Sequence, residues 1–339
     1  MRASIIIPVR NGGRTIAQTV RACLEQDFPA EEFEVIVVDD GSTDDTVEQL
    51  RPFPVRIIAQ ANAGVAVARN AGAGRARGAV LLFLDADCAP PKDALSRLVS
   101  EVEENSDVGL VGGIYASATD SSVIARAINE EIRYRHMRGG SLVHHVGGFC
   151  MTIPTDLFKA IGGFDSHYLR AQDHELCAQV SNEGREIRVI KEVAFAHNHS
   201  RTLSEWLRNQ YLQAHYRSSS VIRHSAVLGS DGYVNHRDWF SLLLGALTIG
   251  LLPILWLPRV AWVFAGAVTL SAVLHVPVAA FAIRDTGDWR QAMIVPIQVL
   301  RGVVWAAGAA SGLLARISDR LNGCAPAEMQ RSGAKPRRC

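Results

Sequence analysis

Two pairs of carboxylates in this chain each follow a run of apolar residues. Asp39 and Asp40 come after one run, and Asp85 and Asp87 come after another. Runs of this kind are typical of strands that are buried on both faces of a parallel sheet. Acids at the carboxyl ends of such strands lie at the sheet edge where open α/β proteins bind ligands. Because close like charges repel, the second pair predicts a bound divalent cation, and the first pair could hold a base and ribose; the alternative for the second pair is an acidic turn that caps the next helix.

The elements that would position these acids alternate between strand and helix. Strands are predicted at residues 3–8, 33–38, 55–60 and 79–84, with helical spacing of apolar residues between them. Thr43 is expected to cap the second of these helices. The alternation predicts an α/β fold with a doubly wound, mostly parallel sheet and right-handed crossovers. Neither GxGxxG after the first strand nor GxxxxGKS/T occurs, which excludes a typical dinucleotide site and a P-loop.

The overall composition excludes several classes of protein. The 339 residues carry a formal net charge of +1, so we expect no nucleic-acid partner. The six cysteines are scattered without CxxC spacing, which argues against a zinc site and against a small disulfide scaffold. The first ten residues do not resemble a signal peptide, so the first domain is expected to start in the cytosol.

Three long apolar runs follow the first 235 residues. Residues 239–258 and 260–283 carry no Asp, Glu, Lys or Arg, and residues 292–315 carry only Arg301. Each run has about the 20 residues that a helix needs to cross a bilayer. Arg301 would cost about 2.5–3.5 kcal/mol at the bilayer centre, and basic residues at both ends of this region place both ends in the cytoplasm. We therefore expect a spanning hairpin with the third run at the interface or re-entrant; three spans are the alternative.

Four sequence blocks together resemble a known family. The blocks "SIIIPVRN", "VIVVDDGSTDDT", "NAGVAVARNAG" and "LLFLDADC" begin at residues 4, 35, 62 and 81. In this order and spacing they resemble the nucleotide-diphospho-sugar transferases of family 2, the inverting glycosyltransferases of GT-A fold. The resemblance covers about residues 3–220.

The resemblance implies a donor site and a metal site. It implies that Asp40 bonds the nucleobase, and that Asp85 and Asp87 form a DxD-type motif in which Asp85 contacts the donor and Asp87 binds Mn²⁺ or Mg²⁺. His197 is expected to complete the metal site. The other donor contacts that it implies are Pro8, Arg10, Asn11, Arg69 and Asn70. The family commonly has an aromatic residue where Arg10 stands, and a guanidinium can also stack on a base, so the base stays open.

The second half is expected to hold the catalytic base and the acceptor. Asp173 in "QDHEL" matches the family's catalytic Asp, while Gln172 stands where the family usually has Glu. An inverting transfer needs one carboxylate to take the proton of the attacking hydroxyl; His174 and Glu175 are neighbouring alternatives. Gly147, Gly148 and Gln172 are the expected acceptor contacts. The segment "NQYLQAHYR" lacks the QxxRW motif of processive members, which favours one sugar per acceptor.

We therefore expect three regions and one function. Residues 1–235 would form the GT-A domain, with a donor half to about 112 and an acceptor half at about 113–220; residues 236–318 would anchor it, and residues 319–339 would be a basic, disordered tail. The expected enzyme is a metal-dependent hexosyltransferase at the cell membrane, with its catalytic domain on the cytoplasmic side. It would move sugar from a nucleotide diphosphate sugar to a glycolipid or polyprenyl-linked glycan of the cell envelope. Alternatives are a polyprenyl-phosphate sugar synthase, a metal-dependent nucleotidyltransferase and a catalytically silent membrane scaffold.

Overall fold

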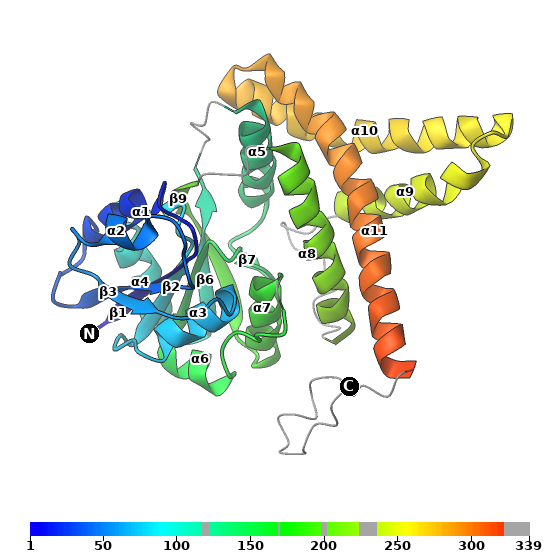
Figure 1. Cartoon of the computed structure of the whole chain (residues 1–339). Helices are drawn as coiled ribbons and strands as arrows, with labels where there is room; N and C mark the ends of the chain where they lie inside the picture. Colours follow the sequence, from blue (N-terminus) through cyan, green and yellow to red (C-terminus); the bar gives the residue numbers. More distant parts are fainter. Residues whose placement is uncertain (117–121, 169, 198–201, 224–235, 322–339) are drawn as a thin grey trace.

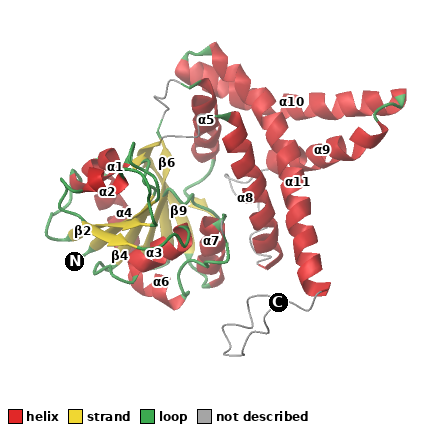
Figure 2. Cartoon of the chain, viewed as in Figure 1, coloured by secondary structure: helices red, strands yellow, loops and turns green. Residues whose placement is uncertain are grey.

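The computed structural model describes residues 1–116, 122–168, 170–197, 202–223 and 236–321 (Figure 1). An α/β domain with one mixed sheet comes first in the chain, and a group of long helices packs beside it (Figure 2). Both the strand–helix alternation and the long apolar helices agree with the sequence-based expectation. The tail beyond residue 321 lies outside the described residues.

The first half of the sheet consists of four parallel strands in the order β3-β2-β1-β4. The strands are β1 (Ala3–Val9), β2 (Phe33–Asp39), β3 (Arg56–Ala59) and β4 (Val80–Leu84), and the helices are α1 (Ile16–Leu24), α2 (Thr46–Leu50), α3 (Val65–Ala73) and α4 (Ala94–Glu104). Because these strands are parallel, the acids that follow β2 and β4 lie at the same sheet edge. The prediction for Thr43 was wrong: α2 begins at Thr46, and the Thr43 N–H donates instead to Asn11 Oδ1 at 2.8 Å.

The second half of the sheet reverses direction beside β4. Strand β8 (Cys150–Pro154) runs antiparallel to β4 and to β6 (Val108–Tyr115), and β9 (Glu186–His197) runs parallel to β6. The short strands β5 (Cys88–Ala89) and β7 (Leu142–Val143) pair with β9. Helices α5 (Val123–Arg138), α6 (Thr155–Ala160) and α7 (Gln172–Asn182) complete this half. The pairing of Cys88 with His197 places the end of β9 next to the second acid pair.

An apolar core fills each face of the sheet, as expected for strands buried on both sides. Ile5 and Ile7 belong to one core and Ile6 to the other, and Leu82 and Phe83 divide in the same way. This division follows from the two-residue period of a strand, which directs neighbouring side chains to opposite faces.

The remaining helices pack together beside α5. They are α8 (Leu203–Arg223), α9 (His236–Leu251), α10 (Pro258–Thr286) and α11 (Ile294–Leu321), with short 3₁₀ turns at Leu252–Ile254 and Trp289–Met293. Within the described part of the chain, three helical segments are long and apolar enough to cross a membrane: His236–Ile254, Pro258–Thr286 and Trp289–Ser318. Figure 1 shows α9 and α10 as a hairpin that projects away from the α/β domain, whereas α11 runs along α8. A third apolar core joins α5 and α8 to α10 and α11.

Candidate functional site

Asp40 lies in the wall of a pocket at the carboxyl edge of β1 and β2. Its carboxylate accepts hydrogen bonds from Gln60 Nε2 and the Ala63 N–H, both at 2.8 Å, and from the Gly64 N–H at 2.9 Å. These contacts fix the loop that begins α3. The pocket has a volume of about 490 Å³, and its lining residues are Pro8, Val9, Arg10, Asp40, Asn62, Gly64, Val65, Ala68, Arg170, Leu212 and Tyr216. Its mixture of apolar, cationic and aromatic side chains suits a nucleotide.

Two predicted donor residues lie outside that lining and hold loops in place. Asn11 has a positive φ of 55°, its N–H donates to Ser42 Oγ and its Oδ1 accepts from the Thr43 N–H. It thereby ties the loop after β1 to the loop after β2. Asn70 Nδ2 donates to the Phe164 carbonyl at 2.8 Å, and Asn70 Oδ1 accepts from the Phe164 N–H at 3.0 Å. Asn70 thus fixes the glycine-rich turn that precedes α7.

Arg69 connects the first half of the domain to the second. Its Nη2 donates to Asp85 Oδ1 at 2.7 Å and to the Gly148 carbonyl at 2.8 Å, and the side chain is buried. Burial raises the pKa of Asp85, although the positive charge of Arg69 opposes that rise. The Gly148 N–H donates in turn to Asp173 Oδ2 at 3.1 Å. One glycine therefore links the second acid pair to the predicted base.

Asp87, Cys88 and His197 form a cluster of ligand atoms. The three atoms lie within 4.8 Å of one another, and His197 Nε2 is 3.4 Å from Asp87 Oδ1. Burial and the charge of Asp85 raise the pKa of Asp87 to about 7. Burial also raises the pKa of the Cys88 thiol well above its usual value, so this thiol is a poor ligand at neutral pH. A carboxylate and an imidazole remain, a donor set that fits a divalent cation such as Mn²⁺.

Asp173 lies in the first turn of α7 and faces the same edge of the sheet. Its Oδ2 is 3.5 Å from His145 Nε2, and its Oδ1 accepts from the His174 N–H at 2.9 Å. Burial alone would raise the pKa of Asp173, but His145, Arg217 and this N–H together hold it well below the usual range. The carboxylate is therefore ionised at neutral pH, as a proton acceptor must be. Gln172 is buried on the same helix, and it lines neither the pocket beside Asp40 nor the second cavity described next.

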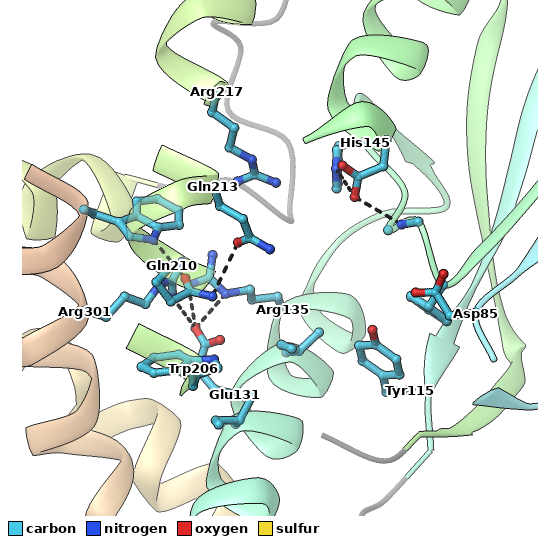
Figure 3. A pocket seen from close by; sticks show the side chains of 17 residues that line it. Asp85, Tyr115, Glu131, Arg135, His145, Trp206, Gln210, Gln213, Arg217 and Arg301 are labelled. Carbon is cyan, nitrogen blue, oxygen red and sulfur yellow. Dashed lines mark hydrogen bonds and ion pairs between the residues drawn. The ribbon is translucent and has the colours of Figure 1, made fainter. Parts of the chain in front are cut away.

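A second cavity extends from Asp85 and Asp173 toward the long helices (Figure 3). It has a volume of about 200 Å³. Its lining residues are Asp85, Tyr115, Ile128, Glu131, Ile132, Arg135, His145, Gly147, Gly148, Phe149, Asp173, Trp206, Gln210, Gln213, Arg217, Arg301 and Trp305. Of the predicted acceptor contacts, Gly147 and Gly148 lie in this wall.

Sequence reasoning missed most of the wall that α8 provides. Leu212 and Tyr216 line the first pocket, whereas Gln210, Gln213 and Arg217 line the second, so one helix borders both. The spacing of residues 210, 213 and 217 was an available signal, because side chains three and four positions apart share a helix face.

Comparison with known proteins agrees with this architecture. Residues 4–162 match the family model described as "Glycosyl transferase family 2". Over 215 residues the chain is 28% identical to glycosyltransferase AglE of Haloferax volcanii. This match covers 61% of this chain and 70% of AglE. Over 131 residues it is 35% identical to undecaprenyl-phosphate 4-deoxy-4-formamido-L-arabinose transferase of Pseudomonas syringae, covering 35% of this chain and only 37% of that relative.

The fold also occurs in a solved structure. The mannosyltransferase PcManGT from Pyrobaculum calidifontis, solved in complex with GDP-Man and Mn²⁺, has a TM-score of 0.60 at 18% identity. The likeness covers 92% of this chain and 87% of that chain. At this identity the likeness concerns the fold. Together with the family match and the named relatives, it establishes that residues 4–162 are a family 2 glycosyltransferase domain of GT-A fold, and that the chain is a glycosyltransferase.

Proposed function

We propose that the enzyme transfers a sugar from a nucleoside diphosphate sugar to a hydroxyl group of a membrane-associated acceptor, with inversion at the anomeric carbon. The observation that carries this proposal is the shared cavity of Asp85 and Asp173, which opens toward the helices α8 and α11. A donor-side acid and an ionised base thus face one space next to the apolar helices. Because no QxxRW motif is present, we propose that each acceptor receives one sugar.

The chemistry is a single displacement. The acceptor oxygen bonds to the anomeric carbon while the bond from that carbon to the diphosphate breaks, and the hydroxyl proton moves to Asp173. His145 and the N–H groups of Gly148 and His174 orient this carboxylate. The nucleoside diphosphate leaves with the electron pair of the broken bond. His174 and Glu175 are both buried, and neither lines the cavity, which favours Asp173 as the base.

The donor would lie across the carboxyl edge of β1, β2 and β4. Pro8, Arg10 and Asp40 would surround the nucleobase, and Tyr216 of α8 would close the pocket from the other side. Arg69 would hold Asp85 in place beside the sugar, while Asn11 and Asn70 would act by fixing loops. A divalent cation bound by Asp87 and His197 would neutralise charge on the departing diphosphate. The Mn²⁺ in the PcManGT complex supports this assignment.

We further propose that α9 and α10 span the membrane as a hairpin and that α11 does not. Arg301 of α11 pairs with Asp238 in the first turn of α9, so it lies where α9 begins rather than at the bilayer centre. Beyond this point α11 packs on α8 through Gly308 and Gly312. Because α8 lines the nucleotide pocket, the part of α11 that packs along α8 must lie in the aqueous phase and not in the bilayer (Figure 1). The outward apolar face of α11 would then rest on the bilayer surface.

This topology keeps both ends of residues 236–318 on the cytoplasmic side and has a direct test. The described cysteines of residues 1–235 are buried, and the native chain has two more at positions 324 and 339. A membrane-impermeant maleimide should label the C-terminal cysteines in inverted vesicles and not in intact cells. Labelling in intact cells would instead show three spans.

A polyprenyl-phosphate sugar synthase is the second candidate function. The Pseudomonas relative is named as an undecaprenyl-phosphate sugar transferase, and a cation, Arg217, lines the cavity beside Asp173. In such an enzyme a phosphate oxygen attacks, so no hydroxyl proton has to be removed. Replacing Asp173 by Asn would then reduce the rate only slightly, whereas the first proposal requires a large loss.

The test begins with the full chain purified in a mild detergent. Slow hydrolysis of UDP-, GDP- and dTDP-sugars is measured with Mn²⁺ or Mg²⁺ for the wild type, Asp87→Ala and Asp173→Asn. We expect release of one nucleoside diphosphate that depends on metal and is lost in both variants. Asp156→Asn, at an exposed acid of α6, is the matched control. Release of pyrophosphate would indicate nucleotidyl transfer, and metal-independent release would contradict the role of Asp87.

A further inference from the structure

The cavity beside Asp173 contains a cation that forms no salt bridge with the described residues. Arg217 projects into it from α8 (Figure 3). Its Nε is buried and has no hydrogen-bond partner among the described residues, and no carboxylate in those parts of the chain forms an ion pair with it. Its guanidinium carbon lies 5.9 Å from the ring centre of Trp305. A buried donor of this kind is costly unless a ligand satisfies it.

The other two cations of the same wall have partners. Arg135 and Arg301 both pair with Glu131 and with Asp238, so these four charges balance. Arg217 therefore adds a positive charge on the long-helix side of the cavity that no salt bridge of the described residues engages. Its charge also reaches Asp173, whose pKa it helps to lower.

Arg217 lies outside the lining of the donor pocket. The preceding residue, Tyr216, lines the nucleotide pocket, and successive side chains on an α-helix point about 100° apart. The donor pocket has cations of its own in Arg10 and Arg170. Arg217 lines the second cavity and not the donor pocket, so an anion that pairs with Arg217 lies in the second cavity.

The surfaces around Arg217 suit the head of a lipid. Gln210 and Gln213 add amide groups, and Trp305 Nε1 donates to Gln210 Oε1 at 2.8 Å. Arg301 lies 4.2 Å from the Trp305 ring centre and holds the indole in place. Tryptophan side chains are common where a protein meets both water and lipid. Helix α11, which contributes Arg301 and Trp305 to this wall, also packs against the apolar helices α9 and α10.

We propose that Arg217 binds a phosphate group of the acceptor and thereby holds the attacking oxygen next to Asp173. The inference rests on the proposed sugar transfer, by either of the two candidate functions, and it names the acceptor class as a phosphate-bearing lipid instead of a neutral glycolipid. A guanidinium binds phosphate oxygens through two parallel N–H donors, which gives both affinity and orientation. The phosphate can be a monoester at the end of the lipid or a diester that joins lipid to sugar.

Binding to the full chain in neutral detergent tests this without any turnover. The probes are farnesyl phosphate, a farnesyl phosphodiester of N-acetylglucosamine, and farnesol. We expect the wild type to bind at least one phosphate probe about ten-fold or more tightly than farnesol, as one charge-assisted contact implies. Tighter binding of the monoester identifies a bare lipid phosphate, and tighter binding of the diester identifies a sugar-bearing lipid.

Three variants make the test specific to Arg217. Arg217→Gln should abolish the preference for phosphate, whereas Arg208→Gln, at an exposed site on the same helix, should keep it. Gln213→Glu places a carboxylate four residues before Arg217, a favourable helical pair that should occupy the guanidinium and remove the preference while leaving the helix stable.

Two results would overturn the proposal. The first is an unchanged phosphate preference in both Arg217→Gln and Gln213→Glu. The second is weaker binding of the nucleoside diphosphate in Arg217→Gln with the lipid preference intact, which would assign Arg217 to the donor. Failure of sugar transfer with every acceptor would count against the proposed function alone, since these binding measurements do not require transfer.

Discussion

Replacing Asp238 by Asn is expected to loosen the contact between the catalytic domain and the long helices. Asp238 accepts from both terminal nitrogens of Arg135, at 2.6 and 2.7 Å, and lies 3.5 Å from Arg301. Glu131 pairs with the same two arginines. All four side chains are at most 9% exposed, so the wild type buries two cations together with two anions.

The substitution would leave two buried arginines facing a single carboxylate. Removing one member of a buried ion pair costs about 3–5 kcal/mol, because the remaining charge stays out of water without its partner. At about 2–4 °C per kcal/mol, the melting temperature should fall by about 6–20 °C. The side chain of Asn keeps the shape of Asp, so the loss reports charge and not volume.

Thermal unfolding of the purified chain in detergent measures this loss, and a double variant tests its origin. Adding Arg301→Met to Asp238→Asn restores the balance of charge, so the pair should lose less stability than the sum of the two single variants, by about 1–3 kcal/mol. Arg97→Gln breaks an exposed pair with Asp93 and should cost less than about 1 kcal/mol. A loss in Asp238→Asn no larger than in this control, or single costs that simply add, would contradict a coupled network of four buried charges.

Three further predictions concern the metal, the base and the helix contact. Mn²⁺ should raise the melting temperature more at pH 8 than at pH 6. The pKa of Asp87 is raised to about 7, so its carboxyl group is mostly protonated at pH 6 and binds the metal less well. In the same thermal scans, Asp87→Asn should lose this difference. At saturating Mn²⁺, Asp173→Asn should lower kcat about 10²–10⁴-fold. While Mn²⁺ is kept saturating at each pH, the wild-type kcat should stay level from pH 8 to pH 5, because the pKa of Asp173 lies below that window; a rate assay across pH would expose any acid limb. Gly308→Val should cost about 1–3 kcal/mol in thermal unfolding, since a Cβ there meets the Tyr211 carbonyl, whereas Gly266→Ala has open space and should cost nothing.

The donor side of the site could be predicted because it follows from local rules. Buried strands show as continuous apolar runs, and parallel pairing brings the ends of such strands to one edge, so Asp40 and Asp85 fall at that edge without knowledge of distant contacts. Strand pairing does not determine the direction of side chains outside the strands. Asn70 follows Arg69 directly, yet Arg69 turns to Asp85 while Asn70 turns to Phe164.

Apart from Gly147, Gly148 and Asp173, the wall of the second cavity could not be predicted, because it is assembled from distant segments. Glu131, Arg217 and Arg301 lie on three helices separated by long stretches of chain, and their proximity depends on tertiary packing. From sequence alone, Arg301 counted only as a cost for inserting a helix into lipid. The structure gives it Glu131 and Asp238 as partners, so its charge joins the helices to the catalytic domain instead of opposing their association.

Helix α8 makes both substrate pockets depend on the same contact. Tyr216 lines the first pocket and Arg217 the second cavity, while another face of α8 packs against α11 at Gly308 and Gly312. A displacement of α11 must therefore move the walls of both pockets together, because close-packed helices transmit shifts instead of absorbing them. If α11 rests on the bilayer surface, transfer from detergent to a bilayer should change the KM of donor and acceptor in parallel. A change confined to the acceptor would mean that α8 holds its position without α11.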